Sequence, residues 1–132
     1  MNKINKRIKL AGLWTTLLLL YIYCDIYSFH RIGYVEEMMA GKIGPFDVTQ
    51  ATLAIFGLLM IIPALMVAAG LLLKAGLAKW LNIIVGVLYT FVNLGNLVGE
   101  TWVYYWIFGV IEIIVTAGII IMAASWRTKE EA

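Results

Sequence analysis

Two acidic residues lie inside hydrophobic segments of this chain, and their type and position suit them to chemistry. Glu112 lies near the middle of the apolar segment 102–126, and Asp25 lies in the last third of the apolar segment 8–29. A carboxyl group deep in a bilayer costs roughly 2.5 to 3.5 kcal/mol on insertion scales and needs a polar partner in the folded protein. Intramembrane carboxyls bind ions or ligands, or relay protons. We therefore take Glu112 as the centre of a candidate site.

Other polar residues recur at helical spacing around Glu112 and along the neighbouring apolar segment 80–98. Tyr105 and Thr116 lie on the same helix face as Glu112. The second segment and its end carry a stripe of Asn82, Tyr89, Asn93, Asn96 and Glu100. Asparagine facing lipid is costly, so this stripe should point into the bundle. The predicted ligand-binding residues are Glu112, Asp25, Asn93, Asn96, Tyr89, Tyr105, Glu100 and Thr116.

These residues are expected to meet in one cavity. At about 1.5 Å per residue, Asp25, Asn93 and Glu112 lie roughly 18 to 23 Å from the end of the bundle that carries the termini. Tyr89 should lie deeper and Glu100 at the mouth. Burial beside a second carboxyl favours the protonated form of Glu112 at neutral pH. The alternative is a neutral, hydrogen-bonded glutamic acid that only fixes helix packing.

Composition places the chain among integral membrane proteins. Its 132 residues are 63% hydrophobic and only 14% charged, and the mean hydropathy is +0.92. The net charge of +2 is too small to indicate nucleic-acid binding. The single cysteine excludes an internal disulfide and a cysteine-rich metal site. His30, Glu36 and Glu37 lack the spacing of metal ligands, so we expect neither metal nor cofactor.

The apolar segments predict an all-α polytopic protein, an up-down bundle of four transmembrane helices within a single domain, 1–132. The expected helices are 8–29, 48–73, 80–98 and 102–126. The outer loop 30–47 is too polar to span, and its residues 34–40 predict a short interfacial helix.

Three local signals refine this outline. Pro63 near mid-membrane frees a backbone carbonyl, which must find a partner or line a polar cavity. Residues 74–79 predict a short turn between the second and third spans. Asp47 and Gln50 have the spacing of a capping box at the start of the second span.

The distribution of basic residues predicts the orientation. Eight of the ten lysines and arginines lie at the end that carries both termini, and only Arg31 and Lys42 lie at the other. This bias places both termini in the cytoplasm. The opposite face, where the predicted cavity opens, is acidic.

Several strings resemble an uncharacterised family of small bacterial four-helix membrane proteins, a domain of unknown function. They are YIYCDIY, MAGKIGP, VTQ, IPALM, KWLNIIVG and the VIE that ends at Glu112. The resemblance covers about residues 8–126. It implies four spans in a bacterial inner membrane and no assigned activity. The architecture also resembles, more loosely, membrane proteins of the DoxX kind.

Three functions remain open at this stage. The first is binding or transport of a cation or small amphipathic ligand in an outward-facing cavity around Glu112. The second is an accessory or assembly protein whose polar groups only specify packing. The third is a membrane enzyme acting on a lipid-like or quinone substrate, with Glu112 or Asp25 as general acid or base. Four short helices make a thin scaffold for a solitary transporter, which favours a homodimer. Gly95 and Gly99 form a small-residue pair suited to packing on another helix or on a second subunit.

Overall fold

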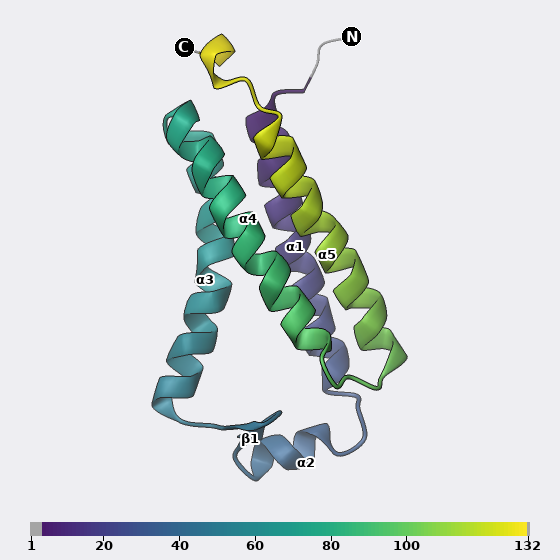
Figure 1. The fold of residues 1–132 in the computed structure, drawn as a ribbon. Coiled ribbons are helices and arrows are strands. Elements are labelled where there is room, and N and C mark those ends of the chain that lie inside the picture. Colours follow the sequence, from purple (N-terminus) through teal and green to yellow (C-terminus); the bar gives the residue numbers. More distant parts are fainter. Residues whose placement is uncertain (1–3, 132) are drawn as a thin grey trace.

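The computed structural model describes residues 4–131, which are almost entirely helical (Figure 1). The long helices are α1 (Lys6–Ser28), α3 (Gln50–Leu72), α4 (Ala75–Leu97) and α5 (Val103–Ala124). Between α1 and α3 lie the short helix α2 (Tyr34–Met39) and a hairpin of strands β1 (Lys42–Ile43) and β2 (Phe46–Asp47). A single 3-10 turn, η1 (Thr128–Glu131), follows α5. The prediction of an all-α, four-span bundle with a short helix in the first connection is confirmed.

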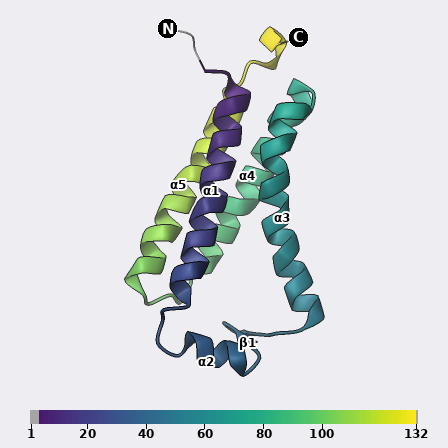
Figure 2. The ribbon, with the colours of Figure 1, turned by 180° about the vertical axis from the view of Figure 1, so that it is seen from behind.

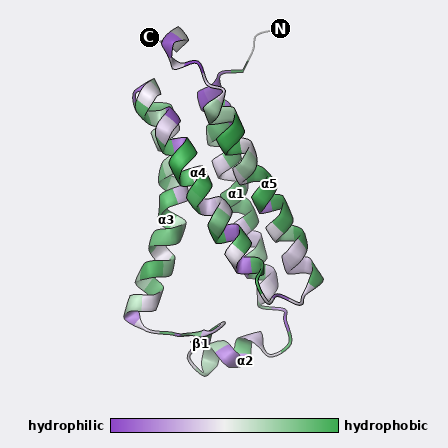
Figure 3. Ribbon diagram, in the orientation of Figure 1, coloured by the Kyte–Doolittle hydropathy of each residue, from purple (hydrophilic) through white to green (hydrophobic). Residues whose placement is uncertain are grey.

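The long helices have the length and composition of membrane spans. They contain 22 or 23 residues, so each is roughly 33 to 35 Å long and matches a hydrocarbon core of about 30 Å. Large apolar side chains cover their outer faces; Phe91 and Ile121, for example, are 67% and 69% exposed. Hydrophilic residues gather toward the two ends of the bundle (Figure 3). These are the features of a multi-pass membrane protein.

The helices alternate in direction, and both described termini lie at one end of the bundle, here called the termini end (Figure 1). The opposite end, which holds α2, the hairpin and the α4–α5 connection, is called the loop end. The neighbouring pairs are α1–α3, α1–α5, α4–α5 and α3–α4, so α1 faces α4 across the bundle. Toward the loop end α3 diverges from the other three helices (Figures 1 and 2).

Two helix starts differ from those expected. Helix α4 begins at Ala75, so only Leu73 and Lys74 separate it from α3 and the turn is shorter than the expected 74–79. Helix α3 begins after Thr49, whose hydroxyl accepts the Thr52 N–H at 3.0 Å. The predicted capping box is therefore wrong. Asp47 belongs to β2 and pairs with Lys42 across the hairpin, so it is not available to cap the helix.

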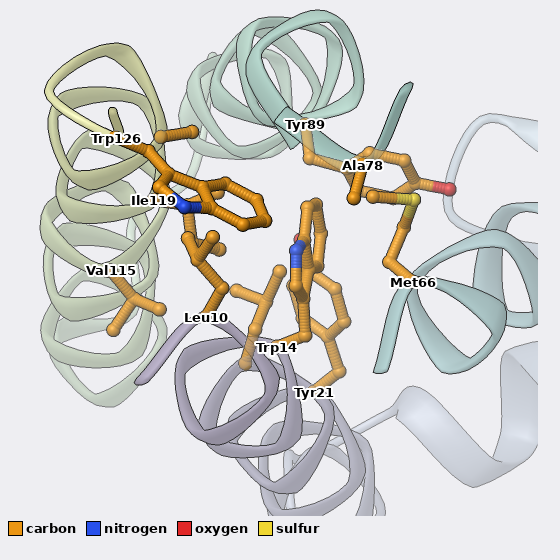
Figure 4. Packing of buried hydrophobic residues seen from close by; sticks show 11 residues of the cluster. Leu10, Trp14, Tyr21, Met66, Ala78, Tyr89, Val115, Ile119 and Trp126 are labelled. Carbon is orange, nitrogen blue, oxygen red and sulfur yellow. The ribbon is translucent and has the colours of Figure 1, made fainter. Parts of the chain in front are cut away.

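Aromatic side chains of α1 fill the centre of the bundle. Trp14 is fully buried and points toward Tyr89 of α4, with the ring centroids 6.1 Å apart, edge to face (Figure 4). The Trp14 indole N–H donates to Asn82 Oδ1 at 2.7 Å, and Asn82 Nδ2 donates to the Ala78 carbonyl at 2.7 Å. Asn82 thus has partners for both ends of its amide. The polar stripe of α4 points inward here, as predicted.

The carbonyl freed by Pro63 finds its partner on another helix. Proline lacks the N–H that would bond the carbonyl of Leu59, four residues earlier. The Tyr89 hydroxyl donates to this carbonyl at 2.5 Å. The expectation that the freed carbonyl needs a polar partner is confirmed, and the bond joins α4 to α3.

Basic side chains close the helix ends at the termini end. Arg7 donates to the carbonyls of Gly70 and Leu73, at 2.7 and 2.8 Å, where α3 ends. Lys6 Nζ donates to Ser125 Oγ at 2.8 Å, and Lys79 Nζ donates to the Trp126 carbonyl at 3.0 Å, just beyond α5. Cations are favourable at helix C-termini because the last carbonyls lack helical donors. Lys3, counted above among the basic residues, lies outside the described residues.

The bond between Tyr89 and Leu59 can be tested by a double-mutant cycle. Tyr89→Phe leaves the carbonyl unpaired, and we expect the free energy of unfolding in detergent to fall by about 1 to 3 kcal/mol. In a Pro63→Ala background the helix supplies its own donor, so the same substitution should cost far less. Tyr23→Phe, at a side chain that is 53% exposed, is the control and should change little. An equal cost of Tyr89→Phe in both backgrounds would contradict the pairing.

Candidate functional site

Glu112 lies on the face of α5 that packs into the bundle. Its side chain is only 5% exposed, and the neighbours at helical spacing, Gly109, Val115 and Thr116, are buried with it. Its carboxyl atom Oε2 is enclosed and has no hydrogen-bond partner among the described residues. A buried polar atom without a partner costs about 1 to 3 kcal/mol, and a charged one costs more. The position thus combines burial with an unmet need for a polar contact.

Near the level of Glu112, a buried pair of hydrogen-bonded polar side chains joins α1 to α4. The Tyr21 hydroxyl of α1 donates to Asn93 Oδ1 of α4 at 2.5 Å. Asn93 is fully buried, and its Nδ2 has no partner within the described part of the chain. Most buried side-chain polar atoms in proteins have a partner, so each of these two orphan atoms calls for an explanation.

Glu112 faces a small cavity between the helices. The cavity has a volume of about 70 Å³, enough for a few water-sized groups. Every long helix contributes to its wall, and the lining residues are Tyr21, Cys24, Asp25, Met60, Val92, Asn96, Tyr105 and Glu112. The buried carboxyl of Glu112 and the exposed carboxyl of Asp25 therefore line one partly open space, here called the inner cavity.

A larger cavity lies between the inner cavity and the loop end. Its volume is about 680 Å³. Asp25, Asn96 and Tyr105 line both cavities, so the two meet at these three side chains. Residues 43–46 of the hairpin and Phe56 of α3 complete its wall, which follows from the divergence of α3 (Figure 2). This space is called the outer cavity.

An ion pair lies in the wall of the outer cavity. Arg31 Nη1 lies 3.1 Å from Glu100 Oε2, and the two side chains are 23% and 11% exposed. Glu100 Oε1 also accepts the N–H groups of Thr101 and Trp102, both at 3.0 Å. Burial raises the pKa of Glu100, but the bonds from Trp102 and Arg31 outweigh it, and the pKa lies below its ordinary value. Burial likewise opposes the charge of Arg31, yet the bond to Glu100 raises its pKa.

The structure brings together part of the predicted site. Glu112, Asp25, Asn96 and Tyr105 line the inner cavity, and Glu100 lines the outer one. The other three predicted residues line neither cavity. Asn93 lies behind Tyr21, and Tyr89 is engaged with the Leu59 carbonyl. Thr116 accepts a hydrogen bond from Thr90 at 2.9 Å, which joins α5 to α4.

Many lining residues were not among the predicted site residues, and four of them show why. Tyr21 shares a helix face with Asp25, and this spacing signal was sufficient to find it. Cys24 and Met60 carry no polar pattern, and only the packing of the helices reveals their contribution. Arg31 lies in a loop, where helical periodicity says nothing about direction.

The expected pair of small residues, Gly95 and Gly99, does not form a helix-packing face. Helix α4 ends at Leu97, and Gly99 lies in the following turn with a φ of 77°. Both glycines line the outer cavity. The interpretation of this motif as a packing surface is therefore wrong, because the helix ends before the second glycine. The homodimer stays a prediction.

Fold and site together define a small four-span membrane protein with an acidic cavity inside the bundle. The chain belongs to the family of unknown function DUF6326, whose sequence model matches residues 2–132. The resemblance to an uncharacterised family is thus confirmed. No curated protein and no solved structure matches the chain.

The ion pair at the outer cavity predicts a pH-dependent contribution to stability. The pKa of Glu100 is lowered from 4.5 in the folded protein. Its stabilising effect is therefore complete above this value and is lost as the pH falls through the lower folded pKa. We expect Glu100→Gln to lower the midpoint temperature of thermal unfolding at pH 7. The difference in this temperature between the variant and the wild type should become smaller toward pH 3. Glu36→Gln, at an exposed residue, is the matched control; a difference for Glu100→Gln that stays constant with pH would contradict the assignment.

Proposed function

We propose that this protein binds a small amphipathic cation in the cavities around Glu112. The observation that carries the proposal is the Glu112 carboxyl itself, which is 5% exposed, lines the inner cavity and has an oxygen without a partner among the described residues. A cationic group entering the cavity would supply the missing contact. Intramembrane carboxyls are functional-site candidates by default.

The charges around the cavities favour a cation over an anion. The inner cavity is lined by two carboxyl side chains, Asp25 and Glu112, and by no lysine, arginine or histidine of the described chain. Arg31 in the outer cavity is already engaged by Glu100 at 3.1 Å. Burial alone favours the protonated form of Glu112, and a positive ligand would favour the ionised carboxylate, because their attraction is strong where water is scarce.

The remaining lining favours a ligand with an apolar part. Met60 and Val92 contribute to the inner cavity, and Phe56 and Val98 contribute to the outer one. Ligand sites usually combine apolar walls with a few polar groups that fix orientation. The tyrosine hydroxyl of Tyr105 and the amide of Asn96 suit this second role where the two cavities meet. An amphipathic amine fits both features.

We further propose that the protein lies in a bacterial inner membrane with both termini in the cytoplasm, so that the outer cavity opens outward. The basic residues support this orientation. Lys42 and Arg31 are the basic residues of the loop end, and the other seven described lysines and arginines lie at the termini end (Figure 1). An excess of lysine and arginine marks cytoplasmic segments.

Removing the charge of Glu112 tests the binding proposal. The purified chain is titrated with n-decylamine and with the neutral n-decanol, and binding is measured by thermal stabilisation. We expect the amine to stabilise the wild type and to bind Glu112→Gln about 10- to 100-fold more weakly, since a hydrogen bond to a charged group is worth about 1.5 to 3 kcal/mol.

Two controls separate a charge effect from a packing effect. Glu37→Gln removes an exposed acidic residue outside the cavities and should bind decylamine like the wild type. Decanol should not distinguish Glu112→Gln from the wild type. Equal amine affinity of the two proteins would refute the proposal and would favour the reading of Glu112 as a packing residue.

The orientation can be tested by labelling in intact cells. In a Cys24→Ser background, which removes the single cysteine, Lys42→Cys and Lys129→Cys are labelled with a membrane-impermeant maleimide. We expect labelling at position 42 in intact cells and labelling at position 129 only after the membrane is opened. The reverse pattern would place the termini outside.

A further inference from the structure

A third cavity lies at the termini end, far from the carboxyls. Its volume is about 720 Å³. It follows the end of α5 and is lined by Lys79, Ser125, Trp126, Arg127, Thr128 and Lys129, together with the helix-terminal Ala124. Three basic side chains and two hydroxyl groups therefore surround one hollow at the boundary of the membrane span.

The surroundings of this cavity are strongly basic. The described side chains at the termini end include the cations Lys6, Arg7, Lys9 and Lys74 in addition to those of the cavity, and no acidic residue. Glu130 and Glu131 follow in the sequence, and their side chains lie outside the described part. Lys6, Arg7 and Lys79 already bond to carbonyls or hydroxyls where α3 and α5 end. Helix capping thus uses part of the hydrogen-bonding capacity of the basic side chains at this end.

The floor of the cavity gives it a second, apolar character. Trp126 is only 3% exposed, and the Arg7 guanidinium lies 5.3 Å from the centroid of its ring. The Lys79 ammonium donates to the Trp126 carbonyl at 3.0 Å, which fixes the start of the segment that carries Arg127 and Lys129. Trp126 belongs to the buried core of the bundle, so it anchors the segment that carries Arg127 and Lys129.

We propose that this cavity binds the phosphate group of an anionic membrane phospholipid. Arginine and lysine side chains bind phosphate oxygens by charge-assisted hydrogen bonds, and a threonine hydroxyl such as that of Thr128 donates a further one. The Ser125 hydroxyl already donates to the Met122 carbonyl at 3.1 Å. Basic pockets at the ends of membrane helices recognise anionic headgroups in this way. The site is independent of the Glu112 cavities, which lie in the half of the bundle toward the loop end. An inorganic phosphate ion shares the same chemistry, and the experiment below separates the two sources.

The test measures lipid binding to the full chain in detergent by native mass spectrometry. Phosphatidylglycerol and phosphatidylcholine are titrated separately, and we expect retention of the first and little of the second. The variant Arg127→Gln/Lys129→Gln should lose at least about 25-fold in affinity for phosphatidylglycerol, since each direct hydrogen bond from a cationic side chain to the phosphate contributes at least about fivefold. Both positions lie beyond α5, and an unchanged helical circular dichroism spectrum verifies that the bundle remains folded.

A matched variant separates a built site from general electrostatic attraction. Lys9→Gln/Lys74→Gln removes the same charge from exposed residues of the same end that do not line the cavity, and it should keep affinity within about twofold to threefold of the wild type. Equal losses in both variants, or equal binding of both lipids by the wild type, would overturn the proposal. Inorganic phosphate is added as a competitor: displacement of the lipid only at concentrations far above those of the lipid supports the lipid as ligand. If the protein retains inorganic phosphate but no lipid, and this binding depends on Arg127 and Lys129, the cavity is an anion site and the proposal of a lipid ligand is overturned.

Discussion

A polar group inside a bilayer has no water to bond to, so its partner has to come from the protein. This requirement determines how the four helices meet. Polar contacts join different helices at several levels of the bundle. They are Trp14 with Asn82, Tyr21 with Asn93, the Tyr89 hydroxyl with the Leu59 carbonyl, Thr90 with Thr116, and Ser28 with Tyr104. Hydrophobic packing tolerates sliding and rotation, whereas each of these bonds requires one depth and one rotation of its helices.

The helices are held together differently at the two ends of the bundle. At the termini end, Arg7 reaches from α1 to the last carbonyls of α3, and Lys6 reaches the last turn of α5. These bonds hold three helices together there. At the loop end α3 diverges, and the hairpin around Pro45 covers part of the resulting space (Figures 1 and 2). The inner and outer cavities follow from this asymmetry, because α3 is joined to α1 at the termini end and diverges from the other helices at the loop end.

Much of this arrangement could be predicted from the sequence, because the governing rule is local. Apolar length predicts a span, helical spacing predicts an inward face, and Pro63 predicts a carbonyl in need of a donor. The partners of the inward residues could not be predicted. Tyr89 and Thr116 have the same signature as Tyr105, yet the first two bond to neighbouring helices and only Tyr105 lines a cavity. Which of them reaches open space depends on the divergence of α3, for which the sequence carries no periodic signal.

Asn82 and Glu112 show what distinguishes a packing residue from a candidate ligand-binding residue. Both are buried polar side chains on inward faces, and Asn82 has a donor for its oxygen and an acceptor for its amide. Glu112 has an oxygen without a partner among the described residues, and a cavity lies in front of it. A residue retained only for packing would be expected to resemble Asn82, since an unpaired buried carboxyl destabilises the bundle. Local rules of polar satisfaction are broken mostly at functional sites. The contrast therefore favours a ligand for Glu112 over a purely structural role.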